Sequence, residues 1–98
     1  MNQIIVNKLR TFFPAYPVEK AWVFGSYARG EETRYSDIDI MIRLDKEAHI
    51  TLFDYAGIMN DLEDLFQKKI DLVQEGRLKK FARQSADEDK ILVYERNN

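Results

Sequence analysis

Three carboxylates in this sequence have the residue type and spacing that can bind a metal ion. Asp37 and Asp39 lie in a stretch, residues 36–44, whose alternating pattern predicts a strand. On a strand, residues two apart point to the same face, about 6.6 Å apart along the chain. Asp71 lies in another predicted strand, residues 69–74, so a third carboxylate can reach the same point if the two strands are neighbours.

Two carboxylates this close together are costly unless a positive charge lies between them. They repel by about 2.5 kcal/mol at an effective dielectric of 20, and a divalent cation would turn that repulsion into attraction. Clustered carboxylates without histidine or cysteine suit hard cations, above all Mg²⁺, which keeps waters and recruits substrate phosphates. The alternative is that Asp37 and Asp39 are solvent-facing residues of a half-exposed strand.

A glycine–serine pair before the aspartates has the features of a phosphate-binding turn. Gly25 ends an apolar predicted strand, residues 18–24, and its missing side chain would let a phosphate approach the backbone. Ser26 is predicted to cap a single helical turn that ends at Gly30, so its hydroxyl and the free amides could hold phosphate oxygens. An ordinary strand-to-helix turn is the alternative. Together, a phosphate cradle and an acidic metal site serve phosphoryl or nucleotidyl transfer.

The elements that must position these residues are short strands flanked by helices. The periodicities predict, in chain order, a helix over residues 4–13 stopped by two prolines, a strand over 18–24, a helical turn over 26–29, a strand over 36–44, a helix of about four turns from residue 51, a strand over 69–74, a short helix with Leu78, Phe81 and Ala82, and a strand over 91–94. The four-turn helix is predicted to use one face, with Leu52, Tyr55, Ala56, Met59, Leu62 and Phe66. This layout predicts an α+β (two-layer α/β) architecture.

Length and composition restrict the classes of protein further. Ninety-eight residues are room for one domain, expected to cover residues 1–98. The 15 basic and 17 acidic residues nearly balance, so nucleic acid is not expected as a direct partner. The chain has no cysteine and a single histidine, His49, which excludes thiolate and multi-histidine metal sites. With no apolar run near about 20 residues and no signal-peptide core, we expect a cytoplasmic protein without membrane contact.

The motif spacing resembles that of a known family. Gly25-Ser26, ten residues, then Asp37-Ile38-Asp39 is similar to the signature of the DNA polymerase β-like nucleotidyltransferase superfamily. The run GSYARGEETRYSDIDI resembles the minimal nucleotidyltransferases (MNT), which act as antitoxins beside HEPN-domain ribonuclease toxins. The similarity continues through KKIDLVQEGRLKKFARQ and ends with ILVYE. The fold implied is a small mixed central sheet flanked by helices.

The resemblance implies a role for each motif residue. Asp37 and Asp39 would bind two Mg²⁺ ions, and Asp71 would complete the metal site nearer the attacking hydroxyl. Gly25 and Ser26 would hold the triphosphate of ATP. The implied reaction transfers AMP from ATP to a tyrosine hydroxyl of a HEPN-type toxin, with which the chain would form a hetero-oligomer.

Two other classes of function remain open at this point. The chain could be a binding module, an antitoxin that neutralises its partner by contact while its nucleotide site is vestigial. The three intact aspartates favour the enzyme, because clustered carboxylates bring no advantage to a pure binder. Transfer to a small molecule or an RNA end is a third interpretation, disfavoured because such substrates generally require a further domain or a basic channel.

Several residues near the motifs have competing interpretations. Arg29 could contact phosphate, or pair with Glu31 or Glu32. Tyr27 could stack on a base or pack in the core, whereas Trp22 is expected in the core and His49 in solvent. Phe13 and Tyr16, beside two prolines, are expected to form an exposed aromatic patch for a partner.

Overall fold

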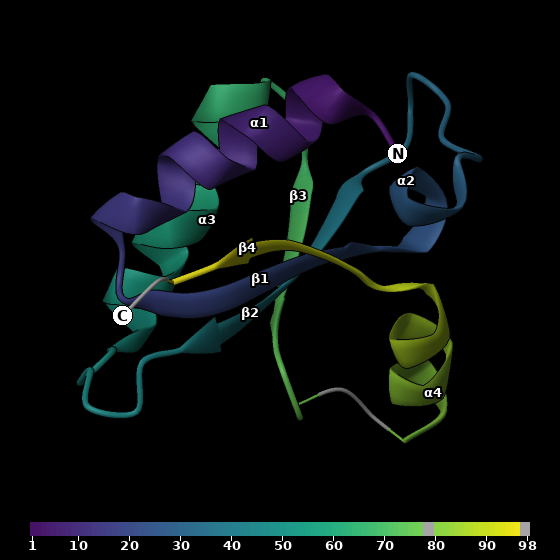
Figure 1. Ribbon diagram of the computed structural model, residues 1–98. Helices are drawn as coiled ribbons and strands as arrows, with labels where there is room; N and C mark the ends of the chain where they lie inside the picture. Colours follow the sequence, from purple (N-terminus) through teal and green to yellow (C-terminus); the bar gives the residue numbers. More distant parts are fainter. Residues whose placement is uncertain (78–79, 97–98) are drawn as a thin grey trace.

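A computed structural model describes residues 1–77 and 80–96, which fold as a four-stranded sheet with helices on both faces (Figure 1). In chain order the elements are α1 (Gln3–Phe12), the 3₁₀ turn η1 (Phe13–Ala15), β1 (Val18–Phe24), α2 (Gly25–Arg29), β2 (Ile38–Leu44), α3 (Leu52–Phe66), β3 (Ile70–Gln74), α4 (Lys80–Asp89) and β4 (Ile91–Glu95). The α+β class predicted from the sequence is confirmed. Within the described part of the chain, no helix is long and apolar enough to cross a membrane.

The sheet is mixed, with the strand order β3-β2-β1-β4. β1 runs antiparallel to both β2 and β4, whereas β2 and β3 are parallel. Parallel neighbours need a crossover connection, and α3 provides it. Because β2 and β3 run in the same direction, both begin at the end of the sheet where β1 finishes. The predicted strands that carry the aspartates are therefore neighbours.

The two faces of the sheet pack against different helices. Helices α1 and α3 pack against one face and form the main core with it. To this core β2 contributes its alternating isoleucines, Ile38, Ile40 and Ile42. The opposite face, here called the outer face, carries a smaller cluster in which Trp22 and Met41 pack under α4. Figure 1 shows α1 and α3 together on one side of the sheet and α4 on the other. The odd-numbered residues of β2 and β3 therefore lie on the outer face.

The long helix α3 uses most of its predicted packed face, and the clear exception lies in its first turn. Thr51 caps it, in a capping box with Asp54, and the helix runs for the predicted four turns. Ile58 and Leu62 are buried, and three further residues of the predicted face are partly buried against the main core: Tyr55, Met59 and Phe66. Leu52, predicted on the packed face, is 86% exposed. The first turn of α3 is exposed because it extends past the part of the helix that packs on the sheet.

The exposed aromatic patch predicted around Phe13 and Tyr16 is wrong. Phe13 is fully buried in the main core and meets Phe12 edge-on, with ring centroids 5.3 Å apart. Tyr16 is half-buried, stacks on Phe12 at 4.4 Å and donates its hydroxyl to Asp61. The turn η1 directs the side chain of Phe13 into the core, and the two prolines alone do not predict this direction.

Three single residues, Trp22, His49 and Tyr27, can be compared with their predicted environments. Trp22 is buried and His49 is exposed, as predicted. Tyr27, for which two interpretations were open, packs in the main core. The predicted short helix corresponds to α4, although Leu78 and the side chains of residues 81–82 lie outside the described residues.

Candidate active site

The candidate site lies at the end of the sheet where β1 finishes and β2 and β3 begin. In the register of the sheet, Phe24 is the partner of Asp39, and Asp39 is the partner of Asp71. These residues form one row across three strands. Since directly paired residues project to the same face, the two carboxylates meet on the outer face. The expected approach of Asp71 to Asp39 is confirmed.

Asp37 is placed differently from its prediction. β2 begins at Ile38, so Asp37 precedes the strand instead of belonging to it, and it is exposed. The backbone N–H of Ile38 donates to the carbonyl of Lys69, and this bond ties the start of β2 to the turn before β3. Asp37 is therefore at the rim of the site and close enough to Asp39 to act on its charge.

Electrostatics identify Asp39 as the central carboxylate. Its pKa is raised from 3.8 to about 6, first by partial burial, then by the negative charges of Asp71 and Asp37, and by a hydrogen bond with Asp71 that only a protonated carboxyl can make. Arg29 opposes the shift from a distance. A strongly perturbed carboxyl beside like charges is a candidate functional group.

The donor set fits a hard cation, although the three carboxylates do not form a closed cage. Within residues 1–77 and 80–96, no three His, Cys, Asp or Glu side chains lie close enough together to form a complete metal site. The structure brings Asp39 and Asp71 together and leaves Asp37 at the rim. Mg²⁺ is commonly held by only one or two carboxylates, with waters and substrate phosphates as its other ligands. The residues present therefore fit Mg²⁺ with a bound nucleotide.

Gly25 lies directly against the central carboxylate. Its φ of +71° is in the left-handed region, which an L side chain rarely adopts. A Cβ built on Gly25 would collide with Oδ2 of Asp39 and lie 3.1 Å from its Cγ. Position 25 thus requires glycine because its backbone closely approaches Asp39, and the sequence does not reveal this contact. It also leaves the backbone bare at the point where a phosphate would enter.

Ser26 is not the helix cap that the sequence predicts. α2 begins one residue earlier, at Gly25, with Phe24 as its N-cap, and no side chain caps it. Ser26 is half-buried inside the single turn of α2 and directly follows Gly25, the residue that lies against Asp39. The predicted end of the turn is confirmed, because Gly30 adopts a φ of +72° and its N–H bonds back to the carbonyls of Ser26 and Tyr27.

Arg29 uses its guanidinium to connect the turn to α4. It donates to Glu31 at 3.3 Å, one of the two partners expected, and to Asp89 at 2.5 Å. The Asp89 contact joins α2 to α4 across 60 residues of sequence and could not be predicted from local spacing. Arg29 also remains 41% exposed at its side chain, so it is accessible to a ligand at the site.

Tyr55 is a residue of the site region that sequence analysis assigned only to a packed helix face. Its hydroxyl donates to the carbonyl of Leu72 at 2.6 Å, which fixes α3 against β3 next to Asp71. Burial and the charge of Asp71 raise the pKa of Tyr55 to about 12. The hydrogen bond of Tyr55 depends on how α3 packs on β3, and no sequence pattern predicts that packing.

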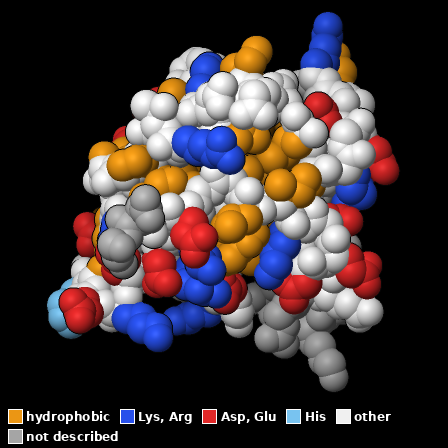
Figure 2. All heavy atoms as spheres, in the orientation of Figure 1, with side chains coloured by type: hydrophobic (Ala, Val, Ile, Leu, Met, Phe, Trp, Pro, Cys, Tyr) orange, Lys and Arg blue, Asp and Glu red, His pale blue; other side chains and the backbone are white. Residues whose placement is uncertain are grey.

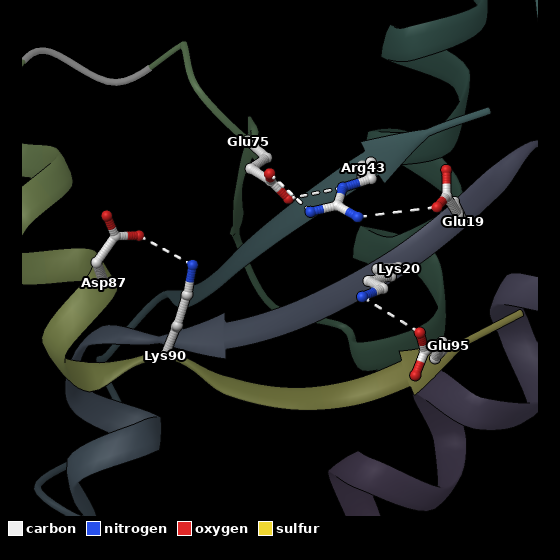
Figure 3. Close-up of polar contacts among 7 residues, drawn as sticks. All are labelled: Glu19, Lys20, Arg43, Glu75, Asp87, Lys90 and Glu95. Carbon is white, nitrogen blue, oxygen red and sulfur yellow. Dashed lines mark hydrogen bonds and ion pairs between the residues drawn. The ribbon is translucent and has the colours of Figure 1, made fainter. Parts of the chain in front are cut away.

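The other end of the outer face has the opposite arrangement of charge (Figure 3). Arg43 donates to both carboxylate oxygens of Glu75, at 3.0 and 2.9 Å, and lies 3.8 Å from Glu19. Lys20 pairs with Glu95 at 3.2 Å. Figure 2 shows acidic and basic side chains interspersed over the face drawn there. Among the described residues, none of the ion pairs includes a member of the Asp37, Asp39 and Asp71 group.

Comparison with known proteins identifies the family to which this fold belongs. The family model described as "Nucleotidyltransferase domain" matches residues 3–94. The chain therefore belongs to the nucleotidyltransferase family, and the expected enzyme class is confirmed.

Individual relatives and solved structures point in the same direction. A candidate protein adenylyltransferase of Methanocaldococcus jannaschii is 37% identical over 94 residues, which cover 95% of this chain and 94% of the relative. The structure of a candidate minimal nucleotidyltransferase is 27% identical, with a TM-score of 0.73 over 91% of this chain and 89% of that chain. A complex of tri-AMPylated Shewanella oneidensis HEPN toxin with MNT antitoxin gives a TM-score of 0.71 at 17% identity, over 98% of this chain and 74% of that chain. At that identity the last likeness shows the fold alone.

Proposed function

We propose that this chain is a Mg²⁺-dependent protein adenylyltransferase that transfers AMP from ATP to a tyrosine hydroxyl of a HEPN-type toxin. It works as an antitoxin, as a single domain in the cytoplasm and in a hetero-oligomer with that toxin. The observation that carries the proposal is the row in which Asp39 and Asp71 are paired across β2 and β3 with Gly25 against them. The adenylyltransferase relative supports the same activity, and the complex of HEPN toxin with MNT antitoxin supports the same kind of partner.

Each residue of the candidate site has a distinct task in this reaction. Asp37 and Asp39 would hold two Mg²⁺ ions, and Asp71 would complete the metal site on the acceptor side. Gly25 and Ser26 hold the triphosphate against the start of α2. When bound, Mg²⁺ neutralises the developing charge on pyrophosphate and favours loss of the acceptor proton.

The acceptor hydroxyl needs help because a tyrosine has an ordinary pKa near 10. Asp71 is exposed, so an acceptor from another protein can approach it. Its carboxylate takes the phenolic proton while the tyrosine oxygen attacks the α-phosphorus. The bond to the bridging oxygen breaks, and pyrophosphate leaves. Asp39 is half-buried and therefore less accessible than Asp71 to an acceptor from another protein.

The test uses ATP labelled on its α-phosphate, Mg²⁺, the purified chain and a lysate of its own host. The Asp37→Asn/Asp39→Asn double variant is run beside the wild type, with Glu75→Gln as a control that removes a carboxylate from the paired end of the outer face. We expect a labelled protein band with the wild type and with Glu75→Gln, and none with the double variant.

Other outcomes would change the proposal in defined ways. Label on RNA or on a small molecule would keep the nucleotidyltransferase and replace the acceptor class. If neither protein transfers label, while both still copurify with the same partner, neutralisation by contact alone is the better account. Equal labelling by the wild type and the double variant would remove Asp37 and Asp39 from the site.

A further inference from the structure

The five tyrosines of the chain differ sharply in what their hydroxyl groups contact. Tyr27 is buried, and Tyr94 is partly buried against the main core. Tyr16 donates to Asp61, and Tyr55 donates to the carbonyl of Leu72. Tyr35 alone among the five is highly exposed, at 78%. A modifying enzyme that acts on tyrosine hydroxyls would therefore find one open target on this chain.

The exposed tyrosine lies in the loop that leads into the candidate active site. Tyr35 is two residues before Asp37, in the loop that joins α2 to β2 beside α2 (Figure 1). The loop is held across the two strands that carry the carboxylates, because Lys68, just before β3, donates to the carbonyl of Arg34 at 2.8 Å. The N–H of Tyr35 also donates to the side chain of Thr33 at 3.2 Å. The ring is therefore presented by an anchored loop.

A cation accompanies this hydroxyl. Arg34 donates from its guanidinium to the phenolic oxygen of Tyr35 at 2.7 Å, and the guanidinium carbon lies 4.8 Å from the ring centroid. The oxygen is thus an acceptor whose lone pairs face a positive charge. Arginine pairs well with phosphate oxygens, so the same guanidinium is positioned to bind a phosphodiester formed on this oxygen.

We propose that Tyr35 is a self-modification site, and that the chain transfers AMP from ATP to its own Tyr35. This inference rests on the proposed adenylyltransferase function and adds an acceptor to it. The Tyr35 oxygen forms a bond to the α-phosphorus, the bond to the bridging oxygen breaks, and pyrophosphate leaves with the electron pair. The phenolic proton passes to Asp71. The product is a tyrosyl-AMP phosphodiester with Arg34 beside its negative charge.

The experiment incubates the purified chain with Mg²⁺ and α-labelled ATP, first alone and then with host lysate. Intact-mass measurement and peptide mapping locate any AMP on the chain. Tyr35→Phe removes the proposed acceptor oxygen and keeps the ring. Tyr16→Phe is the matched control because it removes a hydroxyl that contacts Asp61 instead of the loop before Asp37. We expect one AMP on Tyr35 in the wild type and in Tyr16→Phe, and no self-label in Tyr35→Phe, which still labels the lysate acceptor.

The outcomes separate this inference from the function on which it rests. AMP mapped to any other residue, or self-label that persists in Tyr35→Phe, overturns the assignment of Tyr35. An unlabelled chain together with a labelled lysate protein also overturns it and leaves the adenylyltransferase intact. Absence of label on both the chain and every lysate component overturns the two proposals together.

Discussion

The two ends of the outer sheet face use charge in opposite ways. At one end, Arg43 lies between Glu75 and Glu19, so each charge has a partner. At the other end, Asp39 and Asp71 are paired side by side, and among the described residues only Arg29 opposes their charge, from a distance. The same sheet and the same face carry both arrangements. Where charge has only a structural role it is neutralised locally, and where it is left uncompensated a ligand is expected to complete it.

The middle of the face separates these two ends. Trp22 and Met41 are buried there under α4, with Val73 packed against them. Asp39 and Arg43 are four residues apart on one strand, about 13 Å along the chain. Screening at physiological ionic strength acts over about 8 Å. Each end is therefore largely independent of the other, and substitutions at one end serve as controls for those at the other.

The largest effect is expected from removing one carboxylate at each end and measuring AMP transfer. Asp39→Asn should lower the rate on the order of a thousand-fold, because a metal-stabilised transition state is worth several kcal/mol. Glu75→Gln removes a carboxylate of the paired end and should change the rate by no more than about twofold. The measurement is the initial rate of label transfer from α-labelled ATP. Equal losses in the two variants would mean that the ends do not differ in function.

The next largest effect is expected at the glycine that touches the central carboxylate. Gly25→Ala combines a left-handed backbone with a collision at Asp39, and should reduce the free energy of unfolding by about 2–4 kcal/mol. Gly30→Ala has the same φ and no atom of the described residues within 4 Å of its new Cβ, so it should cost only about 1–2 kcal/mol. Gly57→Ala, within α3 and equally open, should add about 0.5–1 kcal/mol of stability.

Urea unfolding of the three glycine variants measures these differences directly. The gap between Gly25→Ala and Gly30→Ala isolates the contact with Asp39 from the backbone conformation. If the two variants were equally destabilised, Gly25 would be required for its φ alone, and its contact with the carboxylate would have no energetic consequence.

The glycine also shows which parts of the site could be read from the sequence. The boundaries of β1 and the presence of a helix between β2 and β3 follow from local periodicity. That β2 and β3 are neighbours comes from the sheet topology, so the approach of Asp71 to Asp39 could be predicted only on that condition. The reason for Gly25 was not, because its contact with Asp39 joins residues 14 apart through the antiparallel pairing of β1 and β2. The sequence shows that residue 25 is a glycine, and the register of β1 and β2 explains why a larger residue would not fit there.

Other misses have the same physical origin. Ser26 was expected to cap α2, but the helix starts at Gly25 because the backbone turns there at a positive φ. Leu52 fits a helical stripe, yet it lies in a turn of α3 that extends past the packed face. The Arg29–Asp89 contact depends on where α4 lies. Each of these is set by tertiary packing, which a periodic pattern does not contain.

A smaller effect, with a defined pH dependence, is expected from Asp39 in the metal-free protein. Its pKa is raised from 3.8 to about 6, so the folded chain binds more protons than the unfolded chain between about pH 4 and pH 6. Stability contributed by the protonated form is complete below about pH 4 and is lost as the pH rises through about 6. Asp39→Asn removes this loss, since a neutral amide can donate to Asp71.

Thermal unfolding in EDTA, at pH 7.5 and at pH 4.5, measures this difference. At pH 7.5 Asp39→Asn should be more stable than the wild type, on the order of 1–2 kcal/mol after allowance for solvent screening. At pH 4.5 most of the gain should disappear. A variant less stable than the wild type at pH 7.5 would show that the Asp39 carboxylate is already satisfied by the fold, contrary to the comparison of the two ends.

The smallest effect is expected at the paired end, and it has the opposite sign. Glu75→Gln removes a two-point contact with Arg43, which keeps Glu19 as a second partner, so the loss should be below about 1 kcal/mol at pH 7.5. It should shrink further in 1 M NaCl, where screening acts over about 3 Å. Because the two ends are separated by the apolar middle row, the effects of Glu75→Gln and Asp39→Asn should add within about 0.5 kcal/mol in the double variant. A larger coupling in thermal unfolding would mean that one charge network spans the whole face, so that Arg43 already compensates part of the negative charge at the carboxylate row.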